Sequence, residues 1–318
     1  MARASTLPEH LRPMLATLAD APFDDPDWVF ESKWDGFRMV TTIAGGKVTL
    51  YSRNGKLLSD SYRPVAQALE RIGRDAVLDG ELVALDAHGV SRFQLLQNAL
   101  KEQARLRYCI FDLMFLGGKD LRRQPLVARK ERLQALLPED ALISFSAHRP
   151  ERGKRYFQEA QRQGLEGLMA KRSASLYLSG ARSTDWLKIK TARRQEAVVV
   201  GFTAPRGSRP HFGALVLAVR EGSAWRYAGH VGTGFSRAVL EQIHGLLRPL
   251  RTAASPFATR VKDEAATTWI APKLVAEVKF TEWTSAGEMR HPVFLGLRTD
   301  KRPEDVVRER ERRRTARQ

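Results

Sequence analysis

The segment of this chain best suited to chemistry is Lys33-Trp34-Asp35-Gly36, which directly follows the strand-like residues 28–31. A lysine at a strand-to-loop junction can present its amine to a bound ligand, and an amine becomes a nucleophile once it loses its proton. A free lysine has a pKa of ~10.4, so neighbouring groups must tune that pKa before Lys33 can react near neutral pH. Taken alone, the motif leaves a nucleophile and an ordinary surface turn equally open.

Acidic and basic side chains recur in short apolar segments further along the chain. These segments are Ser52-Arg53-Asn54-Gly55-Lys56, Asp79-Gly80-Glu81-Leu82, Phe111-Asp112, Glu166-Gly167-Leu168-Met169-Ala170-Lys171 and Trp186-Leu187-Lys188-Ile189-Lys190. Mg²⁺ prefers oxygen ligands and usually takes one or two carboxylates plus phosphate oxygens. Glu81 and Glu166 are therefore candidates for metal and ribose contacts, although a lone glutamate is most often a solvated surface residue.

The overall charge of the chain indicates its class of partner. The 318 residues hold 53 Lys+Arg against 36 Asp+Glu, a formal net charge of +17. Such an excess favours a polyanion such as nucleic acid, with binding that weakens as salt rises. The alternative is that surplus arginine only keeps the protein soluble. Hydrophobic residues at 43% and charged residues at 28% are typical of a globular protein rather than a disordered one.

Several function classes are disfavoured by what the sequence lacks. Cys109 is the only cysteine, so neither an intramolecular disulfide nor a cysteine-based zinc site can form. The seven histidines form no close pair with Asp or Glu at ligand spacing, and no Walker-type phosphate loop occurs. No segment has the length of apolar sequence that a membrane span needs, and residues 1–20 lack an export signal. We therefore expect a soluble intracellular protein that does not associate with membranes.

The pattern of predicted helices and strands changes near residue 191. Before it, strands are predicted at 37–43, 48–52, 76–85 and 108–116, and helices at 62–72, 126–137 and 152–163, the last two amphipathic and basic. After it, strands are predicted at 197–203, 214–220, 225–231 and 274–283, with one helix at 236–247. Several strands with one helix in about a hundred residues are typical of an OB barrel.

The motifs, in this order and spacing, resemble those of the covalent nucleotidyltransferases, which include ATP-dependent DNA ligases, RNA ligases and mRNA capping enzymes. Arg298-Thr299-Asp300-Lys301 resembles the last motif of that superfamily. The sequence around these motifs is similar to that of bacterial end-joining ligases of the ligase D type. The similar segments are Pro13-Met14-Leu15-Ala16, Glu31-Ser32-Lys33-Trp34-Asp35, Gly229-His230-Val231-Gly232-Thr233-Gly234 and Arg290-His291-Pro292-Val293-Phe294-Leu295-Gly296.

The resemblance implies an α+β fold. An ATP-grasp-like nucleotidyltransferase core of antiparallel sheets with helices would occupy residues 1–192, and a C-terminal OB-fold β-barrel would occupy residues 193–305. A basic tail, residues 306–318, would follow. It also implies ATP as the nucleotide and Mg²⁺ or Mn²⁺ as the metal, since both ions accept the same carboxylate oxygens.

The resemblance further implies a role for each motif residue. Lys33 would form a phosphoramide to AMP, and Lys188, Lys190 and a metal ion would lower the pKa of its amine. Glu31 would read the exocyclic amine of adenine, and Phe111 would stack on the base, although core packing explains that ring equally well. Asp35 would orient the Lys33 loop or make an outer contact to the metal, and Arg38 and Arg53 would contact ribose or phosphate groups. Glu81 and Glu166 would contact the metal and the ribose. Arg298, Asp300 and Lys301 would orient the pyrophosphate.

The leading interpretation is thus an ATP-dependent DNA ligase that seals a 5′-phosphate to a 3′-hydroxyl in nicked or broken duplex DNA. An RNA ligase or a capping-type enzyme would use the same lysine chemistry. A basic, OB-containing module that binds nucleic acid without chemistry is the alternative from another class. The end-binding Ku protein or other repair proteins are the partners that the resemblance suggests, and we expect a monomer.

Overall fold

The computed structural model describes residues 7–8, 11–102, 104–205, 209–261 and 266–309. The chain forms two compact units, the first reaching to Thr191 and the second beginning at Ala192. Among the described residues, no helix is both long enough and apolar enough to cross a bilayer.

One sheet of the first unit has six strands in the order β4-β3-β5-β6-β7, with β8 beside β6. Its strands are β3 (Phe37–Ala44), β4 (Lys47–Ser52), β5 (Ala76–Leu85), β6 (Arg105–Leu116), β7 (Lys119–Asp120) and β8 (Ile143–Phe145). The strands predicted at 37–43, 48–52, 76–85 and 108–116 are confirmed. Near-continuous apolar residues suit β5 and β6, which are buried on both faces, whereas β4 alternates between buried and partly buried residues.

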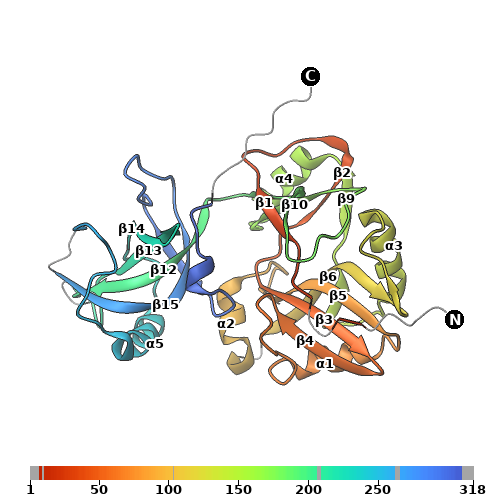
Figure 1. The fold of residues 1–318 in the computed structure, drawn as a ribbon, viewed down its shortest axis with the longest axis horizontal. Coiled ribbons are helices and arrows are strands. Elements are labelled where there is room, and N and C mark those ends of the chain that lie inside the picture. Colours follow the sequence, from red (N-terminus) through yellow and green to blue (C-terminus); the bar gives the residue numbers. More distant parts are fainter. Residues whose placement is uncertain (1–6, 9–10, 103, 206–208, 262–265, 310–318) are drawn as a thin grey trace. The chain divides into compact units, whose positions relative to one another are not determined.

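The other sheet of the first unit has five strands in the order β1-β11-β10-β2-β9. They are β1 (Leu15–Leu18), β2 (Asp25–Ser32), β9 (His148–Glu151), β10 (Gly167–Arg172) and β11 (Arg182–Lys190). Val29 and Trp186 of this sheet share one buried cluster with Val40 and Phe111 of the six-stranded sheet. Figure 1 shows the two sheets as separate layers of the first unit, and their facing side chains form its central core.

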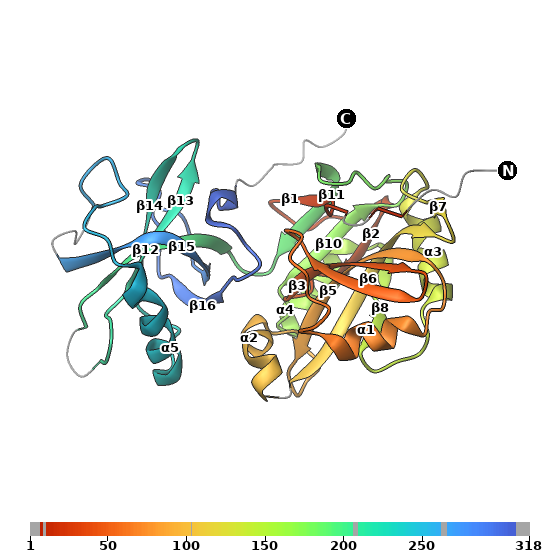
Figure 2. The ribbon, with the colours of Figure 1, turned by 60° about the horizontal axis from the view of Figure 1, so that its bottom comes forward.

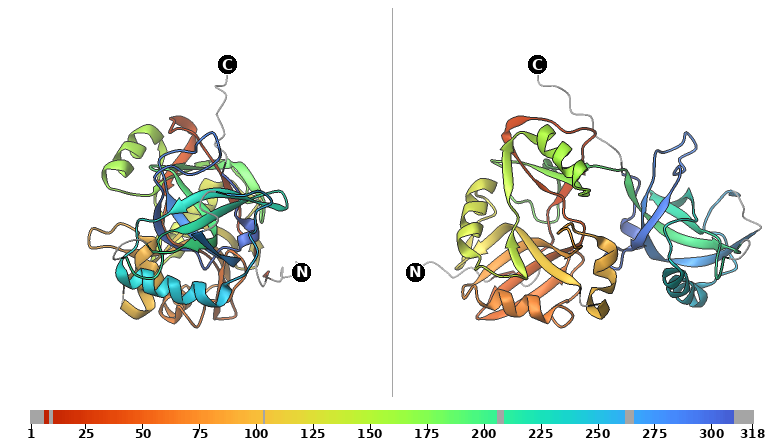
Figure 3. Two further views of the ribbon diagram at one scale, coloured as in Figure 1. Left: turned by 90° about the vertical axis from the view of Figure 1, so that its left-hand side faces the viewer. Right: turned by 180° about the vertical axis from the view of Figure 1, so that it is seen from behind.

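The helices that cover these sheets in the described part of the first unit are α1 (Arg63–Glu70), α2 (Phe93–Glu102), α3 (Leu126–Leu136) and α4 (Gly153–Arg162). Helix α1 inserts Val65 and Leu69 into the core of the six-stranded sheet, and Figure 2 shows it running along that sheet. The view from behind in Figure 3 places α4 against the other sheet, which it contacts through β10 and β2.

Helix α3 differs in character from the basic amphipathic helix that we predicted. Arg129 and Lys130 are fully buried rather than solvated. They lie between Leu126 and Leu133, at the second and third positions of an i, i+3, i+4, i+7 stripe that faces the core. The predicted helix is confirmed, and the burial of its two cations is a feature that the sequence analysis did not identify.

In its described residues, the second unit is a five-stranded antiparallel sheet in the order β14-β13-β12-β15-β16, accompanied by the α-helix α5 (Arg237–Leu247). Its strands are β12 (Arg194–Thr203), β13 (Leu215–Glu221), β14 (Ala224–Val231), β15 (Thr267–Lys279) and β16 (Val293–Leu297). Just past the end of β14, the carbonyl of Thr233 accepts a 2.9 Å hydrogen bond from the Phe294 amide of β16. This bond joins the two edges of the sheet, as in a barrel.

Two details of the second unit differ from the sequence-based prediction. Strand β15 spans Thr267–Lys279 rather than residues 274–283, because Thr267, Thr268 and Trp269 pair with the far end of β12. The short strand β16 was not predicted. Residues 310–318 of the arginine-rich tail lie outside the described residues, whereas the amide of Glu309 donates to Gln195 Oε1 at 3.0 Å.

Candidate active site

The Lys33 amine lies against Glu166 because strand pairing brings two distant segments together. Strand β2 pairs with β10, with Ser32 opposite Leu168, and the Lys33 amide donates to the carbonyl of Gly167 at 2.9 Å. The side chains then meet at 2.5 Å between Lys33 Nζ and Glu166 Oε2. Lys33 retains 19% exposure and Glu166 only 4%, so the pair sits at the edge of a buried region that a ligand can reach.

Two motif glycines permit this arrangement by close backbone approach. A Cβ at Gly36 would lie 2.1 Å from the carbonyl oxygen of Leu82 on β5, and a Cβ at Gly167 would lie 2.1 Å from that of Ile189 on β11. No side chain fits at either distance. The glycines after Asp35 and Glu166 are therefore explained by packing of the loop and strand that carry the two reactive residues.

The electrostatic environment of Lys33 is the reverse of what we expected from its cationic neighbours. Burial lowers the pKa of Lys33, but the carboxylate of Glu166 outweighs that effect, and Asp35 and Glu81 add to it. The pKa of Lys33 is raised as a result. The structure therefore holds Lys33 as an ammonium ion paired to a carboxylate, and the pairing must be released before the amine can attack.

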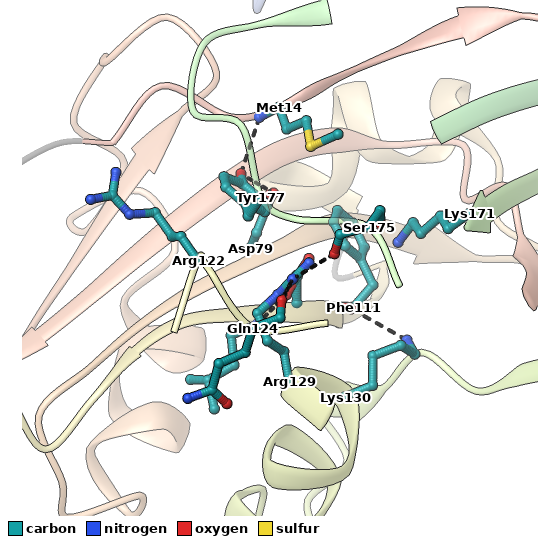
Figure 4. A network of polar contacts seen from close by, with 12 residues as sticks. Met14, Asp79, Phe111, Arg122, Gln124, Arg129, Lys130, Lys171, Ser175 and Tyr177 are labelled. Atoms are coloured by element: carbon teal, nitrogen blue, oxygen red, sulfur yellow. Dashed lines mark hydrogen bonds and ion pairs between the residues drawn. The ribbon is translucent and has the colours of Figure 1, made fainter. Parts of the chain in front are cut away.

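Arg38 is held by a buried acidic residue on the neighbouring strand. Asp79 accepts from Arg38 Nε at 2.5 Å and Nη2 at 2.6 Å, and it also accepts from the Tyr177 hydroxyl at 2.6 Å. The Met14 amide donates to that hydroxyl at 3.1 Å, as Figure 4 shows. Burial lowers the pKa of Arg38, yet Asp79 raises it further, so the guanidinium stays charged. Glu81 lies directly opposite Arg38 in the β3–β5 register.

Cross-strand register places Glu31, Met169 and Lys188 on one face of the five-stranded sheet. Met169 of β10 is directly opposite Glu31 of β2 on one side and Lys188 of β11 on the other. Lys190 lies two residues beyond Lys188, opposite Gly167, and so shares that face. The two lysines of the Trp186 motif are thus on the same face as the nucleobase-reading candidate.

Phe111 is 7% exposed on the six-stranded sheet and is surrounded by cations. The guanidinium of Arg38 lies 4.7 Å from the ring centroid, and the Lys171 ammonium lies 4.1 Å from it. The Trp186 ring packs edge-on against Phe111 at 6.2 Å. These contacts place Phe111 in the core between the sheets, and its role in stacking on a base stays a prediction.

Arg53 and Asp35 flank the same region. The Arg53 amide donates to the carbonyl of Arg38 at 3.2 Å, which ties the turn after β4 to β3. Asp35 is 6% exposed, and its amide donates to Ser91 Oγ at 3.0 Å. One carboxylate oxygen of Asp35 lies within 4.8 Å of one from Glu166.

The remaining predicted residues belong to the second unit. Arg298 donates to both carboxylate oxygens of Asp300 at 2.8 Å and to Glu277 at 2.8 Å, while Lys301 pairs with Glu196 at 2.7 Å. Burial lowers the pKa of Arg298, but Asp300 and Glu277 raise it well above its ordinary value. The orientation of pyrophosphate by these residues stays a prediction.

Sequence reasoning missed three groups of this region, namely Tyr177, Lys130 and the Arg129–Asp112 pair. The guanidinium of Arg129 bonds both carboxylate oxygens of Asp112 at 2.7 and 2.8 Å, with neither side chain exposed. Arg129 and Lys130 occupy the apolar stripe of α3, and these positions could have identified both as buried. Two cations in a core stripe also indicate acidic partners nearby, because buried charges are rarely left unpaired.

Comparison with known proteins decides the family. The family model "ATP dependent DNA ligase domain" matches residues 13–190, and "ATP dependent DNA ligase C terminal region" matches residues 208–301. The chain belongs to the ATP-dependent DNA ligases. The family prediction is confirmed, and so is the fold class of a nucleotidyltransferase core followed by an OB-type region.

Individual relatives of this ligase chain are similar over nearly its whole length. It is 40% identical over 314 residues to the "Multifunctional non-homologous end joining protein LigD" of Pseudomonas aeruginosa, which covers 96% of this chain and 37% of that protein. Its identity to the protein of the same name from Mycolicibacterium smegmatis is 36% over 305 residues, covering 94% of this chain and 40% of that protein. The chain thus spans about two fifths of the length of these curated relatives.

The solved structure "mycobacterial DNA ligase D complexed with ATP and MES" aligns to the ligase chain with a TM-score of 0.71 and 35% identity. The alignment covers 94% of this chain and 98% of that one. The ligase domain of Mycobacterium tuberculosis LigD aligns with a TM-score of 0.54 at the same identity and coverage.

Proposed function

We propose that this chain joins a 5′-phosphate to a neighbouring 3′-hydroxyl in DNA, using ATP and a covalent lysyl-AMP intermediate on Lys33. The observation that carries the proposal is the partly exposed Lys33 amine, 2.5 Å from the buried carboxylate of Glu166. The order of the ligase motifs and the ATP complex of the mycobacterial relative support the same nucleotide.

Self-adenylation begins with loss of a proton from the Lys33 ammonium. Glu166 Oε2, 2.5 Å from Nζ, stabilises the ammonium before this step, and that pairing would weaken with a metal ion on Glu166, which would favour loss of the proton to solvent. The free amine attacks the α-phosphorus, a P–N bond to AMP forms, and the bond to pyrophosphate breaks. Lys188 and Lys190 stabilise the charge on the phosphoryl oxygens, and Arg38 and Arg53 contact ribose or phosphate groups.

The base and the pyrophosphate are held by the other motif residues. Glu31 accepts from the exocyclic amine of adenine, and Phe111 packs against the base. A carboxylate at this position accepts from adenine but repels the 6-oxo group of guanine, which favours ATP over GTP and a ligase over a capping-type enzyme. Arg298 and Lys301 of the second unit orient the leaving pyrophosphate.

The oxygen donors of this site fit Mg²⁺ or Mn²⁺. Carboxylate oxygens of Asp35 and Glu166 lie within 4.8 Å of each other, and Glu81 contributes to the same electrostatic environment of Lys33. Oxygen-only donor sets suit both ions. We propose Glu81 and Glu166 as ligands with Asp35 beside them. A bound ion would neutralise phosphate charge.

DNA with nicks or breaks is the proposed substrate, in line with the net charge of +17 and the end-joining relatives. We propose an adenylation domain at residues 1–192, an OB domain at 193–305 and a basic tail at 306–318. The chain would act in the bacterial cytoplasm as a monomer, recruited by Ku or by other repair proteins.

Transfer of label from ATP tests the chemistry. The full chain incubated with α-labelled ATP and Mg²⁺ should acquire label that Lys33→Ala abolishes, while binding to nicked DNA largely survives. Lys47→Ala, at an exposed lysine of the same unit, is the matched control and should label normally. Persistence of the adduct in Lys33→Ala, or labelling by GTP alone, would refute the proposal.

Joining assays test the substrate. Nicked, cohesive and blunt DNA, each with ATP and either Mg²⁺ or Mn²⁺, should yield sealed product on at least the nicked duplex, and a nicked RNA duplex should not. Sealing of RNA alone would favour the RNA ligase interpretation. Binding of DNA without formation of a lysyl-AMP adduct would favour the interpretation as a nucleic-acid-binding module without catalytic activity.

A further inference from the structure

Glu31 is enclosed by two lysines in the interior of the first unit. Its carboxylate lies 2.9 Å from Lys130 Nζ through Oε1 and 3.0 Å from Lys171 Nζ through Oε2. The three side chains have exposures of 2% or less. Burial raises the pKa of Glu31, but the two ammonium groups outweigh it and lower that pKa, so Glu31 is an ionised acceptor.

The ammonium group of Lys130 contacts three separate segments of the chain. Its ammonium donates to the carbonyl of Ser146 at 2.9 Å and to that of Phe111 at 3.3 Å, and it lies 4.6 Å from the centroid of the Phe145 ring. Figure 4 shows Lys130 reaching from α3 towards Phe111. The ammonium of Lys130 on α3 therefore connects the end of β8, the Phe111 segment of β6 and the carboxylate of Glu31 on β2.

The Glu31 carboxylate keeps an acceptor position open for a ligand. Oε1 is paired with the Lys130 ammonium at 2.9 Å, and a carboxylate oxygen has two lone pairs, so Oε1 can accept from one further donor. Oε2 accepts from Lys171. A ligand N–H that donates to a buried carboxylate forms a charge-assisted hydrogen bond, which is stronger than one between neutral groups.

The place of this oxygen matches a nucleobase. Glu31 shares its sheet face with Met169 and Lys188, and the backbone of Phe111 is bonded to the same Lys130 that pairs with Glu31. A planar heterocycle with an exocyclic N–H can donate to Oε1 while its ring contacts apolar side chains.

We propose that Lys130 is a positioning residue that makes the site selective for a purine with a 6-amino group. It does so by holding the Glu31 carboxylate in place together with Lys171 and by binding the backbone carbonyl of Phe111. The proposal rests on the proposed function, in which ATP adenylates Lys33. Lys130 itself does not touch the nucleotide.

The test compares ATP with purine riboside triphosphate, which lacks the 6-amino group. Single-turnover adenylation of the full chain is measured against nucleotide concentration for wild type, Lys130→Met and the exposed-residue control Lys154→Met. The apparent affinity of Lys130→Met for ATP should fall about ten-fold or more, the size of one hydrogen bond to a charged group. Its affinity for the analogue should change less than about two-fold, and the rate at saturation should persist.

Equal losses for ATP and the analogue would show that Lys130 only supports the fold, and this result would overturn the proposal. If Lys130→Met does not unfold cooperatively, the wild-type protein still tests the proposal. A wild-type protein that binds ATP no more tightly than the analogue would refute selection through Glu31. Glu31→Gln should lose the same preference, and adding Lys130→Met to it should cause no further loss. Failure of wild type to form any lysyl adduct would instead refute the proposed function.

Discussion

Removing Asp112 should destabilise the first unit severely, because it leaves the Arg129 guanidinium buried without its counter-charge. Asp112 accepts from Arg129 Nε at 2.7 Å, Arg129 Nη2 at 2.8 Å and the Leu113 amide at 2.8 Å. Neither side chain of the ion pair is exposed. Asp112→Ala therefore leaves three donors and one full charge without an acceptor in a region closed to water.

Breaking a buried ion pair by removing one partner costs about 3–5 kcal/mol. A total free energy of unfolding of about 5–15 kcal/mol makes this a large fraction of the stability. For a unit of this size about 1 kcal/mol changes the Tm by about 2–4 °C, so the melting transition of the first unit should fall by about 6–20 °C. Differential scanning calorimetry of the full chain, with ATP added to identify the ATP-stabilised transition, measures the change.

Asp140→Ala is the matched control, because Asp140 pairs with Arg71 at 2.6 Å but Arg71 is 57% exposed. Exposed pairs contribute less than about 1 kcal/mol. If Asp112→Ala shifted the transition no more than Asp140→Ala, the Arg129–Asp112 pair would not be the buried contact between α3 and β6 that the structure shows.

Three further predictions concern the site and its substrate. Labelling of Lys33 by an amine-reactive probe, followed by mass spectrometry, should require higher pH in wild type than in Glu166→Gln, because Glu166 raises the pKa of Lys33 against the effect of burial; equal midpoints would contradict this. Gly36→Ala should lower both Tm and adenylation, because its Cβ would lie 2.1 Å from the Leu82 carbonyl oxygen, whereas Gly245→Ala, which meets open space, should do neither. Affinity for nicked DNA should fall steeply as salt rises, since basic residues displace counterions from phosphates; a flat response would point to a different partner.

The linear order of the motifs was enough to identify the ligase family. Local patterns were also enough to predict most strands, because apolar runs such as β5 are buried on both faces and leave few alternatives. The strand β16, of five residues, was missed because its closure of the sheet depends on the Thr233 carbonyl near the end of β14. Non-local pairing of this kind has no local pattern.

By itself, the sequence determined which residue types are present and in what order, and that includes the lysine, the carboxylates and the family they indicate. Only the tertiary structure decided their electrostatics. The contact of Lys33 with Glu166 joins residues 133 apart, and it reverses the expected direction of the Lys33 pKa. The pairing of Lys130 with Glu31, which joins α3 to β2, likewise has no counterpart in the local sequence pattern. Charge interactions depend on distance and on burial, and folding sets both for residues that lie far apart in the chain.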